Sequence, residues 1–178
     1  MSNPHKQIFK KTVGDFKPKT ILDAGSGCTS LSILCEMFPS ARIDAVIFPG
    51  DIRKRDSVAR ANVSCDYELI EVDIAKMTFS KTYDLVIAHL LLGEATKWGN
   101  SITILLKKLF PITKHLMIAD FPEDPEIDFT LIEKLATESG FNISKDIIVP
   151  NDSLFIGKSA DGTEWRGSFY KAILLKKA

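Results

Sequence analysis

The sequence predicts an α/β protein with a largely parallel β-sheet that is covered by helices on both faces. Short apolar runs of strand character alternate with segments of helical periodicity over most of the chain. The first apolar run ends in a glycine-rich turn, as parallel α/β sheets commonly do at a ligand site. After Gly140 the alternation stops, and two strand-like runs follow with no helix between them, which favours antiparallel pairing at the end of the chain.

The individual elements follow from periodicity and from capping residues. Ile102, Leu105, Leu106 and Leu109 recur at the spacing of one helix face, and Gly140 is placed to end the helix before it. The predicted strands are Thr20–Leu22, Ile43–Phe48, Glu68–Val72, Asp84–Ala88, His115–Ala119, Ile143–Val149 and Phe169–Leu175. The predicted helices are an N-terminal one capped by Asn3, then Ser30–Met37, Ile52–Ala61, Ile102–Leu109 and one from Asp128 to Ser139. The polar stretch Pro150–Gly167 is expected to be either a surface hairpin connection or a functional loop.

Length and charge limit the classes of function. With 178 residues and no linker-like stretch, we expect one domain over residues 1–178, with residues 1–18 forming a helical cap. Lys plus Arg and Asp plus Glu both number 23, so no net charge attracts the chain to nucleic acid or to a membrane, although a local nucleic-acid site is not excluded. The densest basic cluster, Arg53, Lys54, Arg55 and Arg60, is interpreted as a solvated helix face.

The cysteines and the apolar runs indicate a cytoplasmic location. Cys28, Cys35 and Cys65 are odd in number and form no C-x-x-C pair, so we expect reduced thiols and neither a disulfide framework nor a metal site. The first residues lack the apolar segment of a signal peptide, and no apolar run is long enough to cross a bilayer.

The turn after the first strand is the main candidate for a binding site. It reads Asp23-Ala24-Gly25-Ser26-Gly27, and its glycines allow a ligand to approach the backbone beside a helix N-terminus. A carboxylate at Asp23 would repel a pyrophosphate and attract an ammonium or a sulfonium. This contrast favours S-adenosylmethionine over NAD or FAD.

With these motifs the chain resembles the class I, Rossmann-like S-adenosylmethionine-dependent methyltransferases over nearly its whole length. Ile21–Gly27 is similar to the family's glycine-rich motif, Glu68–Asp73 to its third strand, and Phe79–Ala88 to the approach to its fourth strand. Asn100–Leu109 with His115–Asp120, and Phe129–Phe141, resemble its later elements. The resemblance implies a three-layer αβα fold with a mostly parallel seven-stranded sheet whose last strand is antiparallel.

The resemblance also implies the cofactor-binding residues. They are the turn residues Asp23 to Gly27, then Asp73 and Ile74 beside the adenine, and Ala88 and His89 after the fourth strand. The family's acidic ribose ligand corresponds to Ile47 when counted from the first motif. It corresponds to Asp51, followed by Ile52, when counted back from the next helix, and we favour Asp51. The third glycine position of the first motif holds Thr29, whose side chain would narrow the pocket.

The residues after the fourth strand concern the methyl acceptor. They read His89-Leu90-Leu91-Leu92, whereas family members that methylate DNA adenine or glutamine carry Asn or Asp, two prolines and an aromatic residue there. We therefore expect a small-molecule or protein acceptor rather than a base in DNA. His89 is expected to line the pocket, with general-base catalysis as the alternative role.

The sequence thus predicts an S-adenosylmethionine-dependent methyltransferase of unidentified acceptor, without a metal. One alternative is a non-catalytic cofactor-binding or partner-subunit protein of the same fold, to which the Ile47 or Asp51 ambiguity and Thr29 both point. An NAD-dependent oxidoreductase is disfavoured by Asp23 and by the lack of room for a substrate domain.

Overall fold

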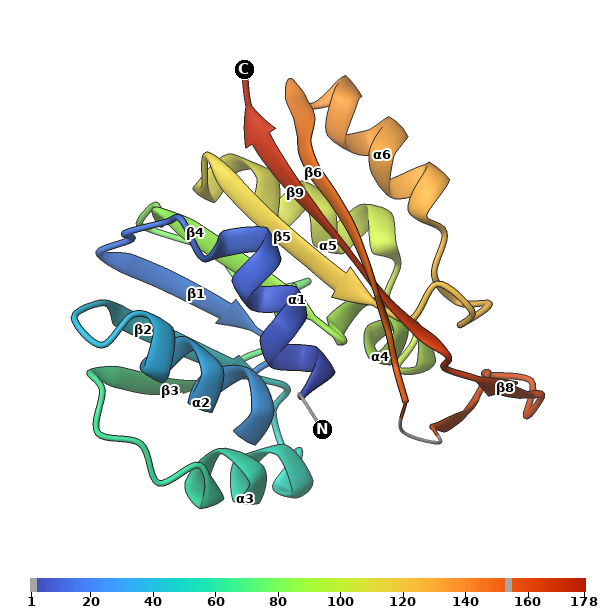
Figure 1. Ribbon diagram of the computed structural model, residues 1–178, viewed down its shortest axis with the longest axis horizontal. Helices are drawn as coiled ribbons and strands as arrows, with labels where there is room; N and C mark the ends of the chain where they lie inside the picture. The colour runs from blue at the N-terminus through green and yellow to red at the C-terminus, as the bar shows by residue number, and fades with distance from the viewer. Residues whose placement is uncertain (1–2, 153–154) are drawn as a thin grey trace.

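The computed structural model describes residues 3–152 and 155–178 and shows three layers, with a β-sheet between two layers of helices (Figure 1). The main sheet has seven strands in the order β3-β2-β1-β4-β5-β9-β6. The strands are β1 Thr20–Ala24, β2 Arg42–Ile47, β3 Tyr67–Glu71, β4 Leu85–His89, β5 His115–Asp120, β6 Phe141–Pro150 and β9 Phe169–Lys177.

Strand direction follows the sequence pattern. β1 to β5 are parallel to one another, while β9 lies between β5 and β6 and is antiparallel to both. The prediction of a mostly parallel seven-stranded sheet with an antiparallel last strand is therefore confirmed. The parallel strands bury both faces, since Ile21 of β1 belongs to the apolar core on one side and Leu22 to the core on the other.

Helices α1 Pro4–Val13, α2 Cys28–Met37 and α3 Ile52–Arg60 cover one face of the sheet. Helices α4 Leu91–Lys97, α5 Ile102–Leu109 and α6 Phe129–Glu138 cover the other, and a short 3-10 turn, η1 Phe110–Ile112, follows α5. The N-terminal helix begins as predicted, with the Asn3 side chain accepting hydrogen bonds from the backbone of His5 and Lys6. Ile8, Phe9 and Val13 are fully buried, so this helix packs as part of the core.

Two predictions about particular segments are settled by the structure. The stretch Pro150–Gly167 contains a hairpin, β7 Ile156–Lys158 paired with β8 Glu164–Arg166, although residues 153 and 154 lie outside the described part of the chain. The expectation of reduced thiols is wrong for Cys35 and Cys65, which form a disulfide, while Cys28 is free. Packing of α2 against α3 and the segment before β3 brings the two cysteines together, with their Cα atoms 5.4 Å apart.

No helix within residues 3–152 and 155–178 is both long and apolar enough to cross a membrane.

Candidate functional site

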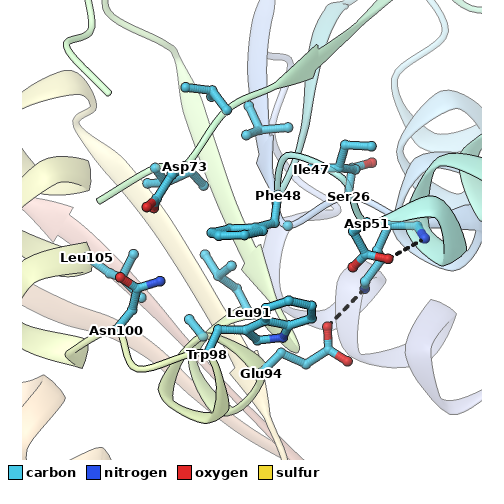
Figure 2. Close-up of a pocket in the computed structure, with 16 residues that line it drawn as sticks. Ser26, Ile47, Phe48, Asp51, Asp73, Leu91, Glu94, Trp98, Asn100 and Leu105 are labelled. Atoms are coloured by element: carbon cyan, nitrogen blue, oxygen red, sulfur yellow. Dashed lines mark hydrogen bonds and ion pairs between the residues drawn. The ribbon is translucent and has the colours of Figure 1, made fainter. Parts of the chain in front are cut away.

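A pocket lies at the carboxyl ends of β1, β2 and β3 (Figure 2), and its empty space, together with the open solvent at its mouth, amounts to about 510 Å³. Ligand sites of open parallel sheets occur at this edge, outside the strand ends. Several residues predicted to bind the cofactor line it: Gly25, Ser26, Asp51, Asp73 and Ile74.

The glycine turn forms one wall of the pocket. Gly25 adopts a positive φ of 78°, which L side chains rarely adopt, and a Cβ there would lie 2.8 Å from Leu91 Cδ1. The next residue anchors the turn to the neighbouring strand, because Ser26 N–H donates to the Val46 carbonyl at 2.7 Å. Gly27 then caps α2. The turn therefore requires glycine at its first position for both backbone conformation and space.

Asp23 stands behind this turn and does not line the pocket. It is fully buried, and its Oδ2 accepts hydrogen bonds from Ser26 Oγ at 2.6 Å and from Ser30 Oγ at 2.8 Å. Its Oδ1 is buried and has no hydrogen-bond partner within the described residues. Burial raises the pKa of Asp23 to about 6, and the two serine hydrogen bonds and the charge of Lys54 oppose that shift. The carboxylate thus fixes the turn against α2.

The structure brings both candidates for the ribose position to the same pocket. Ile47 is the last residue of β2, in agreement with the count from the first motif, and it is almost fully buried. Asp51 lies four residues later as the N-cap of α3, with Oδ1 accepting from Lys54 N–H at 2.9 Å. Phe48, Pro49 and Gly50 form the short connection between them. Ile47 and Asp51 therefore line the same pocket, and of the two only Asp51 carries a carboxylate.

Asp73 follows β3 and lies on the opposite side of the pocket from Asp51 (Figure 2). Its Oδ1 accepts from Ala75 N–H at 3.0 Å, which closes a local turn, and Lys76 Nζ lies 3.5 Å from Oδ2. The carboxylate thus has a structural role in its loop while it faces the pocket. Ile74 beside it is buried and adds an apolar surface.

Three residues that line the pocket, Phe48, Trp98 and Asn100, were not predicted from the sequence. The rings of Phe48 and Trp98 lie 5.2 Å apart across it, centroid to centroid, and Asn100 lies beside them (Figure 2). Trp98 follows α4, a helix that was not predicted because Leu90, Leu91 and Leu92 continue the apolar run of β4. The available signal was the i, i+3 recurrence of Leu92 and Ala95 on one buried face.

The N-cap of α4 is strained. Leu90 adopts φ 53° and ψ 25°, the left-handed conformation that is uncommon for a residue with a branched side chain. This conformation turns the chain sharply from β4 into α4, so that Leu91 reaches the glycine turn.

His89 is buried at the end of β4, on the side of the sheet that faces α1. Its Nε2 lies 2.9 Å from His5 Nδ1, and His5 Nε2 lies 2.8 Å from the hydroxyl of Tyr170 on β9. Burial lowers the pKa of His89 well below its ordinary value, aided by His5 and Lys54, and lowers the pKa of His5 to about 4. Both imidazoles are therefore neutral near pH 7, and a depressed pKa makes His89 a weak proton acceptor.

Asp120, at the end of β5, is a further candidate that the sequence did not identify. It is buried beside Asp124 and accepts from Phe121 N–H at 2.9 Å and Gly93 N–H at 3.3 Å. Burial raises the pKa of Asp120 to about 7, and the charge of Asp124 adds to the shift. A carboxyl group with such a pKa at this sheet edge can exchange a proton near neutral pH.

The remaining predicted site residues lie outside the set that lines the pocket. Ala24 and Ala88 are paired core residues of β1 and β4, and Ile52 is exposed at the start of α3. Thr29 is exposed on α2 and is not among the residues that line the pocket, contrary to the expectation that its side chain narrows it. In the part of the chain that is described, no three His, Cys, Asp or Glu side chains gather as metal ligands would.

Comparison with known proteins identifies the fold. No protein-family model and no curated protein sequence matches the chain. Among solved structures, it is similar to the N-methyltransferase NodS of Bradyrhizobium japonicum in complex with S-adenosylhomocysteine. The TM-score is 0.69 at 12% identity, over 97% of this chain and 85% of that one.

Two further structures show the range of similar proteins. One is the magnesium protoporphyrin IX methyltransferase ChlM of Synechocystis, with bound S-adenosylhomocysteine, at a TM-score of 0.66 and 16% identity over 98% of this chain and 84% of that one. Another is the 16S rRNA methylase RmtB, at a TM-score of 0.62 and 16% identity, covering 98% and 62%. Together with the strand order, these similarities show that the chain has the Rossmann-like fold of the class I S-adenosylmethionine-dependent methyltransferases.

Proposed function

We propose that this chain binds S-adenosylmethionine in the pocket at the ends of β1, β2 and β3 and transfers its methyl group to an acceptor. The observation that carries the proposal is the pair of carboxylates, Asp51 and Asp73, on opposite sides of an apolar pocket whose wall is the glycine turn. Carboxylates can accept hydrogen bonds from the ribose hydroxyls and from the base edge of a nucleoside. They would repel a phosphate group placed beside them. An S-adenosyl cofactor has those hydroxyls and no phosphate.

Each residue has a proposed task. Asp51 binds the ribose hydroxyls through the oxygen that does not cap α3, and Asp73 with Ile74 borders the adenine. Asp23 acts on the turn through Ser26 and Ser30. The bound cofactor supplies an electrophilic methyl group. The chain supplies position and excludes water, which are the main requirements of such a displacement.

The acceptor side is proposed to lie beside the ends of β4 and β5, where His89 and Asp120 are buried. Burial lowers the pKa of His89, which opposes proton uptake and argues against a role as general base, so we propose that His89 supports the acceptor side without proton transfer. Asp120, with a pKa of about 7, is the better proton acceptor for a substrate that must lose a proton. We propose a small-molecule or protein acceptor, since the Asn/Asp-Pro-Pro pattern for exocyclic amines is absent from the sequence after His89.

We further propose that residues 1–178 act as one domain, with α1 as its cap, and the packing of α1 on the sheet supports this. The cytoplasmic location expected from reduced thiols loses that support, because Cys35 and Cys65 form a disulfide and disulfides are rare in reducing compartments.

Ligand-dependent stability tests cofactor binding. S-adenosylmethionine and S-adenosylhomocysteine should each raise the free energy of unfolding, by about 2.7 kcal/mol at a hundredfold excess over Kd. NAD at the same concentration serves as the control and should have no effect. If neither S-adenosyl compound stabilises the protein at millimolar concentration, the proposal fails. Transfer of labelled methyl groups into fractionated extract then shows whether a small molecule, protein or RNA is the acceptor.

A further inference from the structure

Lys54 differs from the other members of its basic cluster. The side chain of Arg53 is 68% exposed and that of Arg55 is 48% exposed, and Arg55 pairs with Glu71 on the surface. The side chain of Lys54 is 23% exposed and lines the pocket. The interpretation of the cluster as a solvated face therefore holds for the two arginines and fails for Lys54.

The ammonium group of Lys54 lies next to the glycine turn. A Cβ on Gly27 would lie 3.7 Å from Lys54 Nζ. Because Gly27 is the N-cap of α2, the ammonium group lies close to the start of that helix. A helix N-terminus carries partial positive charge on its free N–H groups, which adds to the charge of the lysine. The two together make this corner of the pocket attractive to an anion.

The present partner of Lys54 can be exchanged. Its Nζ lies 3.6 Å from Glu94 Oε2, which is beyond hydrogen-bond distance, and this pair links α3 to α4. Glu94 has a closer partner in Arg53, at 3.2 Å. Lys54 can therefore turn to a ligand without leaving the Glu94 carboxylate unpaired.

A negative charge lies behind the same turn. Asp23 is fully buried, and its Oδ1 has no hydrogen-bond partner among the residues that the structure describes. The corner thus presents a cation at its surface and an unsatisfied carboxylate oxygen behind it. A ligand group that carries both a carboxylate and an ammonium, as an α-amino acid does, matches this arrangement of charges.

We propose that Lys54 binds the carboxylate at the amino-acid end of S-adenosylmethionine, and this inference rests on the proposed function. Lys54 is then the residue that distinguishes the full cofactor from nucleosides that share its adenosine and thioether. The competing interpretation is that Lys54 only ties α3 to α4 through Glu94. That role would affect all ligands of the pocket equally.

Two ligands that differ in the amino-acid end separate these interpretations. S-adenosylhomocysteine carries that end, and 5′-methylthioadenosine lacks it. Isothermal titration of the native protein and of Lys54→Met with both compounds should show S-adenosylhomocysteine weakened about 10- to 100-fold in the variant, as expected for loss of a charge-assisted hydrogen bond. The affinity for 5′-methylthioadenosine should change less than about threefold, which also shows that the variant is folded.

Two matched variants complete the experiment. Arg55→Met removes the same charge from a neighbouring residue that pairs with Glu71 and not with Glu94, and it should leave both affinities unchanged. Lys54→Arg should restore most of the binding of S-adenosylhomocysteine. Equal weakening of both ligands by Lys54→Met, or no weakening of either, would overturn the role of Lys54 while the proposed function stands. Failure of both ligands to bind the native protein would overturn the proposed function and this inference with it.

Discussion

The clearest test of the pocket architecture compares two glycines with nearly the same positive φ. Gly25 has φ 78° and Gly50 has φ 77°, and both flank the candidate site. A Cβ on Gly25 would lie 2.8 Å from Leu91 Cδ1 and 3.2 Å from Leu91 Cβ, whereas a Cβ on Gly50 would meet nothing within 4 Å. The two alanine substitutions therefore share the cost of a positive φ and differ in the contact with α4.

The magnitudes follow from these two contributions. Left-handed backbone costs an alanine about 1–2 kcal/mol, which is the whole expected loss of stability in Gly50→Ala. Gly25→Ala adds the displacement of Leu91, about 1–3 kcal/mol for an overpacked contact, so its total loss is about 2–5 kcal/mol. Because Leu91 also lines the pocket, Gly25→Ala should in addition weaken the binding of S-adenosylhomocysteine.

Urea unfolding of both variants measures the stability difference, and calorimetric titration measures the affinity. Equal losses of stability in the two variants would show that α4 does not press on the glycine turn. Retention of full cofactor affinity by Gly25→Ala would refute the placement of the ligand against this turn.

Three further predictions concern other parts of the molecule. Asp51→Ala should lose a ribose contact and a helix cap together, weakening S-adenosylhomocysteine binding by about 1–3 kcal/mol in calorimetry, and unchanged affinity would favour a pocket without an acidic ribose ligand. Reduction of the Cys35–Cys65 disulfide, whose cysteines are 30 residues apart, should lower the free energy of unfolding by about 3–4 kcal/mol in urea titrations with and without reductant. Asp120→Asn should stabilise the protein progressively, relative to the native chain, as the pH rises from about 4 to 7. The raised pKa means that the folded native protein binds more protons than the unfolded chain in that range, so its stability falls as the pH rises through it. Once the pH lies above both pKa values, the pKa shift of Asp120 corresponds to about 4 kcal/mol in the free energy of unfolding. If the difference in unfolding free energy between the two proteins does not vary with pH, Asp120 is not a buried carboxyl that titrates in this range.

The strands and most helices could be predicted because their determinants are local. The apolar face of Ile102–Leu109, Asn3 as an N-cap and Gly140 after a helix each act within a few residues. Strand direction followed from whether a helix lay between two runs, as for β6 and β9. Helix α4 was missed because its start depends on a left-handed Leu90, for which the sequence carries no glycine or asparagine signal.

The parts of the site that could not be predicted depend on contacts between distant segments. His5, His89 and Tyr170 are separated by as many as 165 residues and meet only because α1 packs over β4 and β9. Cys35 and Cys65 likewise meet only when α2 lies against α3 and the segment before β3. Neither arrangement has a periodicity or a short motif to reveal it.

The same distinction explains why the side chain of Asp23 lies behind the glycine turn and not in the pocket, as its position in the sequence had suggested. Its distance from Gly25 in the sequence indicated a carboxylate in the crevice, because the backbone there leads to the strand end. The side chain belongs instead to the face of the sheet that α2 covers, where Ser26 and Ser30 hold it. Alternation along β1 decides this, since Asp23 shares its face with Ile21 while Leu22 and Ala24 belong to the other. The glycine motif therefore locates the turn, while the two-residue alternation along β1 decides whether the side chain of Asp23 faces the ligand. In this molecule Lys54, Asp51 and Asp73 are the charged groups that line the pocket together with Glu94.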